Sequence, residues 1–256
     1  MRRNAAPRAS GRPGIPLSLV LALFAWLLPS AAALAGDAAL IDFLGYSKDR
    51  DHFAFEEYGI QDGSGLAYST IYIVELSTDS WVKGTPYRVQ APESDPDKPL
   101  TTVRAEARSR AQADLDALEI SQPARILALI GDGAVDTDAH MLRFADPVCC
   151  GAGATSDDIQ TLRLETFESD TAFDCMGLVG QKGLGYALAL SAGGTERELH
   201  RDKARLPLSR GCPMDYRLYA VVDAFDTGGR HVAIVSTHPF GFEGPDRRFL
   251  AVPLGD

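Results

Sequence analysis

Two glutamates stand side by side in the stretch "FAFEEYGIQDGSG", residues 53–65. Glycoside hydrolysis requires two carboxyl groups roughly 5–9.5 Å apart across a cleft. Glu56 and Glu57 are adjacent, however, and on a strand they would face opposite sides, so they cannot act directly as an acid–base pair. A second carboxyl group would have to come from Glu243 or Asp246, in the segment "GFEGPDRR".

The same two polar segments are candidates for a binding surface, because loops on a rigid scaffold commonly carry function. The candidate residues are Glu56, Glu57, Tyr58, Gln61 and Asp62 in the first segment, and Glu243, Asp246, Arg247 and Arg248 in the second. The two arginines would form ion pairs with the first segment's acids if the two segments are neighbours. We therefore predict binding rather than catalysis, with an envelope-directed hydrolase that uses carboxylates of the 56–62 and 243–248 loops as the alternative.

Two other groups of residues have types suited to chemistry. Asp136, Asp138 and His140 alternate in "DTDAH", so an extended backbone would point all three to one side, where they could hold a divalent cation; the alternative is an acidic loop. Ser236 and His238 occur together in "STH", but the sequence has no G-x-S-x-G motif, and we expect neighbours on a strand to face opposite sides. We predict no catalytic residue there, and no cofactor, because no nucleotide motif is complete.

The first 35 residues have the pattern of an export signal. Four arginines precede the apolar run "IPLSLVLALFAWLLP", and Ala33 and Ala35 supply the small residues that a signal peptidase reads. We expect cleavage after Ala35 by the general export route, which leaves residues 36–256 as a single secreted, β-rich domain in the periplasm or outside the cell. The alternative is an uncleaved anchor, because residues 15–35 are long enough to span a membrane. After cleavage, we expect no stable membrane span.

Cleavage would make the chain more acidic. Four of the 25 basic residues leave with the signal, so 21 basic residues face 35 acidic ones and the net charge becomes −14. Such a surface repels nucleic acid, because phosphate binding needs Lys and Arg. The expected partner is an envelope protein or a small ligand.

Four cysteines remain after export: Cys149, Cys150, Cys175 and Cys212. Disulfides are expected in an oxidising compartment, and four cysteines allow three pairings. Adjacent cysteines bond to each other only with a distorted peptide, so the 149–150 pair is disfavoured. A zinc site is the other option, but the sequence has no C-x-x-C motif.

Short β-like runs separated by glycine-bearing turns dominate the rest of the chain, with "YSTIYIVELS" the clearest strand. Thr101 or Thr102 can cap one helix, whose apolar face is formed by Val103, Ala107, Ala111, Leu115 and Leu118. We predict a mainly β (α+β) fold of antiparallel sheets with one substantial helix, either sandwich-like or built of partial propeller-like blades. A faint repeat aligns the hairpin that begins at His52 with the one that begins at His231.

Three blocks are more distinctive than composition: "FLGYSKDRDHFAFEEYGIQDGSGLAYSTIYIVEL", "LPLSRGCPMDYRL" and "GFEGPDRRFLAV". Together they resemble a bacterial family of predicted secreted proteins, a domain of unknown function, over residues 40–254. The resemblance implies export, a single domain and no assigned activity. It also implies that Cys175 in "FDCM" and Cys212 in "SRGCP" form the disulfide pair, whereas Cys149 and Cys150 depart from the family pattern and the state of these two cysteines stays open.

Overall fold

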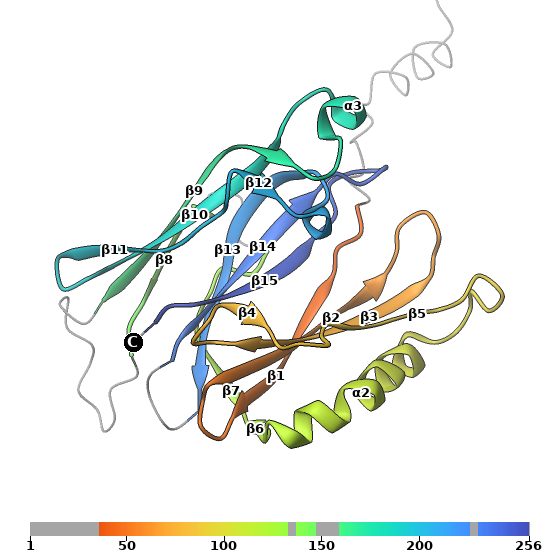
Figure 1. Cartoon of the computed structure of the whole chain (residues 1–256), viewed down its shortest axis with the longest axis horizontal. Helices are drawn as coiled ribbons and strands as arrows, with labels where there is room; N and C mark the ends of the chain where they lie inside the picture. The colour runs from red at the N-terminus through yellow and green to blue at the C-terminus, as the bar shows by residue number, and fades with distance from the viewer. Residues whose placement is uncertain (1–35, 133–136, 147–158, 226–229, 256) are drawn as a thin grey trace, which may run out of the picture. The chain divides into compact units, whose positions relative to one another are not determined.

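Three sheets stack face to face in the computed structural model, and one long helix covers the outer side of the first sheet (Figure 1). The structure describes residues 36–132, 137–146, 159–225 and 230–255. The strands pair antiparallel, apart from one short parallel pair. The prediction of a mainly β fold with antiparallel sheets and one substantial helix is confirmed, and the stacking is sandwich-like.

The first sheet contains β1 (Leu40–Ser47), β2 (His52–Ile60), β3 (Ala67–Glu75), β4 (Ser80–Trp81), β5 (Tyr87–Gln90) and β6 (Ile120–Gln122). Its order is β4-β3-β2-β1-β6, and β5 also pairs with β3. Strands β2 and β3 are buried along most of their length because both faces of the sheet are covered. Phe53 and Phe55 pack toward the central sheet, which is described below, whereas Ile71 packs under the helix.

The helix, α2 (Leu100–Ala117), buries Val103, Ala107 and Ala111 against the first sheet, as the periodicity predicts. Its small alanines allow the helix backbone to approach the sheet closely. The predicted threonine cap is wrong: Pro99 occupies the N-cap position, and no side chain in the described part of the chain caps the helix. Proline suits a helix start because its fixed φ is compatible with the first turn and its missing N–H leaves no unsatisfied donor.

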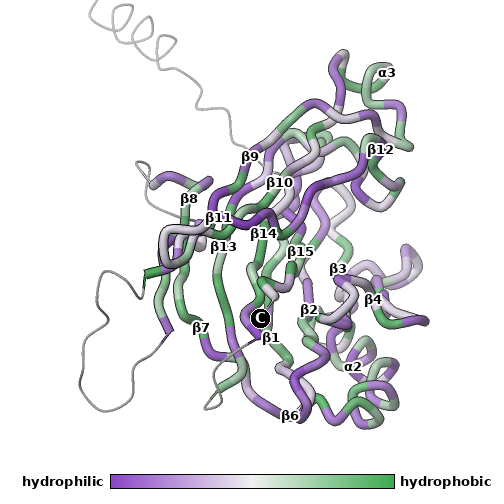
Figure 2. The backbone as a smooth tube through the Cα atoms, turned by 60° about the vertical axis from the view of Figure 1, so that its left-hand side comes forward, coloured by the Kyte–Doolittle hydropathy of each residue, from purple (hydrophilic) through white to green (hydrophobic). Residues whose placement is uncertain are grey.

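The central sheet contains β7 (Ala124–Leu129), β13 (Pro213–Ala224), β14 (Val232–Pro239) and β15 (Arg248–Pro253), in the order β15-β14-β13-β7. Both of its faces are apolar: Val222 and Ile234 pack toward the first sheet, whereas Val221 and Val235 pack toward the third. Figure 2, coloured by hydropathy, shows green stretches along β13 and β14, in contrast to the mainly purple β11. Strand β15 is an edge strand of this sheet.

The third sheet contains β8 (Met141–Phe144), β9 (Gln160–Thr171), β10 (Gly183–Ala192), β11 (Thr195–Arg201) and β12 (Arg205–Leu206). Its order is β11-β10-β9-β12, and β8 also pairs with β9; the β9–β12 pair is the parallel one. A short helix, α3 (Cys175–Val179), connects β9 to β10, and a 3-10 turn, η3 (Leu208–Arg210), precedes β13.

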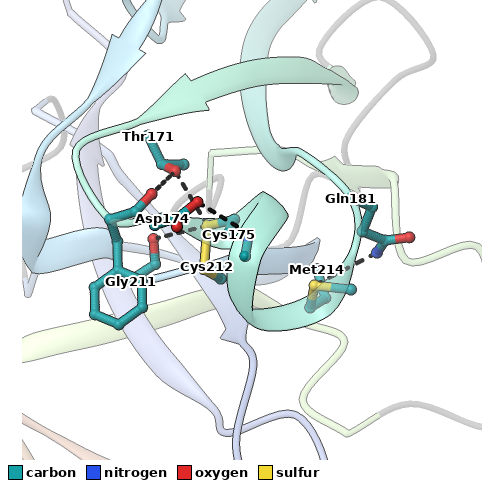
Figure 3. Close-up of a disulfide and its surroundings, with 9 residues drawn as sticks. Thr171, Asp174, Cys175, Gln181, Gly211, Cys212 and Met214 are labelled. Carbon is teal, nitrogen blue, oxygen red and sulfur yellow. Dashed lines mark hydrogen bonds between the residues drawn. A yellow bond between two sulfur atoms is a disulfide. The ribbon is translucent and has the colours of Figure 1, made fainter.

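The predicted Cys175–Cys212 disulfide is present, with a Cα–Cα distance of 5.5 Å (Figure 3). It joins the first residue of α3 to the residue before β13, and thereby ties the third sheet to the central one. Asp174 caps α3 by accepting a hydrogen bond from the Gly177 N–H at 2.9 Å. Cys149 and Cys150 lie outside the described residues.

The first described residues are held against the last hairpin. Ala38 forms a parallel bridge with Arg247, and the Asp37 N–H donates to Asp246 Oδ1 at 3.0 Å. A Cβ at Gly36 would lie 2.2 Å from the carbonyl oxygen of Pro245, so only glycine fits there. Within the part of the chain that is described, none of the helices has the length and apolarity needed to cross a membrane.

Candidate functional site

The adjacent glutamates of β2 face opposite sides of the first sheet, as their spacing predicts. Both lie within the strand rather than in the loop that follows it. Both side chains are almost completely buried, with 0% of Glu56 and 2% of Glu57 exposed. Burial of a carboxyl group is costly unless it is hydrogen-bonded or paired, so each glutamate must have its own compensating partners. Those partners are entirely different.

Glu56 points toward α2 and is bound by two arginines of that helix. Arg104 Nε lies 2.9 Å from Glu56 Oε1, Arg108 Nη2 lies 2.7 Å from Oε2, and the Ser69 hydroxyl donates to Oε1 at 2.8 Å. Burial alone would raise the pKa of Glu56, but these hydrogen bonds outweigh it and lower the pKa. The Arg104 guanidinium also stacks on the Tyr58 ring, 3.7 Å from its centroid. Glu56 and Tyr58 therefore attach the helix to the sheet.

Glu57 points the other way, into a cleft between the first sheet and the edge of the central sheet. Its Oε2 accepts a hydrogen bond from the Phe249 N–H at 2.8 Å, and its Oε1 lies 3.8 Å from Arg248 Nε. Burial raises the pKa of Glu57 to about 7, although the charge of Arg248 and the Phe249 hydrogen bond oppose the rise. This carboxyl group is therefore poised to change its charge near neutral pH.

Arg248 is the centre of a polar network beside Glu57. Its Nη2 lies 2.7 Å from Asp37 Oδ2 and 3.3 Å from Asp246 Oδ2, and its Nη1 donates to the Tyr68 hydroxyl at 3.3 Å. The ion pair predicted between the second polar segment and an acid of the first is thus present, between Arg248 and Glu57. It forms because the β2–β3 and β14–β15 hairpins lie in sheets that stack on each other.

The cleft has a volume of about 540 Å³ and is lined by side chains from several elements. Glu57, Thr70 and Tyr72 lie on its first-sheet side, with Trp81 at the rim. A second cavity of about 360 Å³ shares Trp81 and Arg210 with the first and continues along β15. A polar groove therefore follows the edge of the central sheet.

Several residues of the cleft were not predicted from the sequence: Tyr68, Tyr72, Trp81, Arg88 and Arg210. Arg88 lies close enough to Glu57 and Tyr72 for its charge to lower the pKa of both, against the larger effect of burial. It makes no ion pair with a carboxylate among the described residues. The alternation of Tyr68, Thr70 and Tyr72 along one strand is the sequence signal that could have placed these three on one face.

The remaining predicted binding residues lie at or beyond the margin of the cleft. Gln61 lines it and donates from Nε2 to Gln90 Oε1 at 3.3 Å. Asp62 and Glu243 are exposed on the two loops. The ion pair expected between Arg247 and the first segment is wrong: the Arg247 Nε donates to the Ala39 carbonyl at 2.9 Å, and its guanidinium pairs with Asp132.

Arg247 lines a different cavity, of about 500 Å³, which also contains Ser236 and His238. The expectation that these two face opposite sides is wrong, because residues two apart on a strand share a face. Ser236 Oγ lies 3.2 Å from His238 Nε2, but the serine is only 3% exposed and its hydroxyl also lies 3.4 Å from the Arg217 carbonyl oxygen. Burial lowers the pKa of His238, with Arg217 adding to the effect.

The predicted cation site falls partly outside the described residues, because Asp136 is not among them. Asp138 Oδ1 accepts a hydrogen bond from the His140 backbone N–H at 2.9 Å, and His140 Nε2 lies 3.0 Å from the Tyr216 carbonyl oxygen. Within the described ranges no three metal-ligating side chains gather into a cluster. The site stays a prediction.

These features define a class: a β-rich protein of three stacked sheets with a polar groove along the edge of the central one. Residues 54–254 match the model of the family described as "Predicted secreted protein (DUF2259)", and the chain belongs to that family. The resemblance read from the sequence blocks is confirmed. No curated protein and no solved structure matches the chain.

Proposed function

We propose that the chain is an exported, non-catalytic binding protein of the cell envelope, located in the periplasm, that takes its ligand into the cleft beside Glu57. The observation that carries the proposal is the convergence of polar side chains from two sheets in a cleft of about 540 Å³. Small-ligand sites are concave and have a few placed polar groups, and this volume is within their usual range. Membership of a family of predicted secreted proteins supports the location.

Arg88 is the group best suited to contact a ligand. The other two arginines of the cleft are occupied: Arg248 by Asp37 and Asp246, and Arg210 by Asp202 at 3.3 Å. Arg88 has no such carboxylate among the described residues. A guanidinium presents a rigid fork of donors that matches a carboxylate or phosphate. The ligand is therefore expected to carry an anionic group.

The alternative, a hydrolase that uses carboxylates of the two polar segments, is less well supported. Acid–base hydrolysis needs two carboxyl groups whose environments push their pKa values apart. In this cleft burial raises the pKa of both Glu57 and Asp246. Neither of these two carboxyl groups has a lowered pKa, so the pair lacks the opposed shifts that would mark an acid and a base.

The test is native mass spectrometry of the mature protein after incubation with a small-molecule and peptide fraction of envelope extract. We expect an adduct on the wild type that is lost in Arg88→Ala and kept in Arg163→Ala, a matched change at an exposed position of β9 outside the cleft. An absent adduct, or one that survives Arg88→Ala unchanged, refutes the proposal. Turnover of a component by the wild type but not by Glu57→Gln would favour the hydrolase.

A further inference from the structure

Strand β15 has one side that no strand of the described residues covers. It pairs with β14 in a regular antiparallel register, with Ala251 opposite Ile234 and no bulge. The Leu254 N–H donates to the His231 carbonyl, so even-numbered residues direct their N–H groups toward β14. Because backbone groups alternate along a strand, Phe249, Ala251 and Pro253 direct theirs toward the open edge.

The edge is blocked at two of these three positions. The Phe249 N–H is bound by Glu57, and Pro253 has no N–H to offer. An inward-pointing charge and a proline are common means of protecting an edge strand from unwanted pairing. Ala251 lies between them, and its edge-facing N–H and C=O form no hydrogen bond with any described residue. One residue of the edge is thus left available for pairing.

This free residue lies in a groove rather than on an open surface. Ala251 and Leu250 line the cavity of about 360 Å³ that continues from the cleft. Trp81, 42% exposed, stands on the first-sheet side, and Arg210 stands on the third-sheet side. Figure 1 shows β15 between these two sheets. At the far end His200 Nδ1 lies 3.3 Å from Asp79 Oδ2, a contact that joins the two walls.

We propose that the ligand of this groove is a short extended peptide that pairs its backbone with β15 at Ala251; the inference rests on the proposed binding function. One peptide residue would exchange two hydrogen bonds with Ala251, and the peptide residues two positions before and after it would donate to the edge-facing carbonyl groups of Phe249 and Pro253. The peptide side chains would alternate between the Trp81 wall and the Arg210 wall. Trp81 favours an apolar side chain on its side.

The first and third sheets, which flank β15 on either side, determine whether a second copy of the chain or a single peptide strand can pair with it. A second copy of this chain would have to bring its own β15 to the edge, but that strand is flanked by the same two sheets, which would meet those of the first copy. A single peptide strand needs only the width between Trp81 and Arg210. The ends of the pairing region are set by the Glu57-bound Phe249 and by Pro253, which limits it to about five peptide residues at about 3.3 Å each.

The test begins with selection of binders from a phage-displayed library of random heptapeptides on the mature wild-type protein. Ala251→Pro removes only an N–H that faces away from β14, and proline is tolerated at such edge positions. We expect it to weaken the selected peptide about tenfold, the cost of one lost hydrogen bond with its partner left unsatisfied, whereas Ala251→Ser, which keeps the N–H, binds as the wild type does.

An N-methyl scan of the selected peptide on wild-type protein makes the test independent of how the variants fold. Strand pairing predicts that N-methylation weakens binding at alternate positions, because alternate N–H groups face the partner strand. Equal loss at all positions, no loss, or no selected peptide overturns the inference, as does a dimer that Ala251→Pro dissociates. An Arg88-dependent adduct that is not a peptide would overturn this inference while leaving the proposed function standing.

Discussion

The two adjacent glutamates should make the stability of the protein respond to pH in opposite directions. Glu57 has a pKa of about 7 in the folded protein, against an ordinary value of 4.5. The folded state therefore holds this proton more tightly than the unfolded state does. The contribution of Glu57 to the free energy of unfolding is fully present below about pH 4.5 and is lost as the pH rises through about 7. At about 1.4 kcal/mol per pH unit, the loss is about 3 kcal/mol.

Glu57→Gln isolates this contribution. Glutamine keeps an oxygen that can accept the Phe249 N–H, but it has no charge to bury. We expect the variant and the wild type to be equally stable near pH 4.5, and the variant to be more stable by up to about 3 kcal/mol near pH 8.5. Urea unfolding at a series of pH values, with the disulfide intact, gives the difference between the two proteins.

Glu56→Gln is the matched control one residue away. The pKa of Glu56 is lowered, because the Arg104, Ser69 and Arg108 hydrogen bonds outweigh burial. Its contribution is present above the ordinary pKa and is lost as the pH falls through the folded value. Glu56→Gln should thus destabilise the protein at neutral pH, and the deficit should shrink in acid. The reasoning is refuted if the Glu57→Gln difference is flat with pH, or if both differences change in the same direction.

Three further outcomes follow from the structure. Arg104→Ala should cost about 3 kcal/mol in urea unfolding, because it strips a partner from buried Glu56, whereas Arg110→Ala, on the exposed side of α2, should cost under about 0.5 kcal/mol. Replacing Cys175 and Cys212 together by serine should lower the free energy of unfolding by about 4 kcal/mol, the chain-entropy value for a separation of 37 residues; an unchanged urea midpoint would contradict it. A fluorophosphonate probe should not label Ser236, because the residue is 3% exposed; a labelled Ser236 in a peptide digest would show a reactive serine.

The periodicity of the sequence correctly predicted which side chains share a face of a single strand or helix. The alternation of a strand placed Glu56 and Glu57 on opposite faces, and the helical spacing identified the buried face of α2 around Val103 and Ala107. These patterns depend only on the repeat of each element. The threonine cap failed because both Thr101 and Thr102 already lie inside the helix, one and two residues after its start.

The order in which the sheets stack is not contained in any local pattern. Arg88 and Arg210 meet in one cleft because a strand of the first sheet and a turn beside the third both flank β15. Their chain positions give no sign of that proximity. The ion pair of Arg248 with the first acidic segment was expected only if the two hairpins are neighbours, and the stacked sheets meet that condition and bring Arg248 to Glu57. Which of the two glutamates it would meet depended on which face α2 covers.

The contact between Asp37 and Arg248 has a consequence for the order of folding. These residues are 211 positions apart, yet their ion pair lies within the polar network of the cleft. On the proposed export route the chain enters the periplasm from its N-terminus, so the first sheet and α2 are available for pairing before β15 arrives. Because β15 lines the groove, the groove is incomplete until this last strand has arrived. Under the proposed binding function, the protein becomes able to bind its ligand only when β15 is in place, and a chain that ends before β15 would have the acids of the cleft without the strand that they flank.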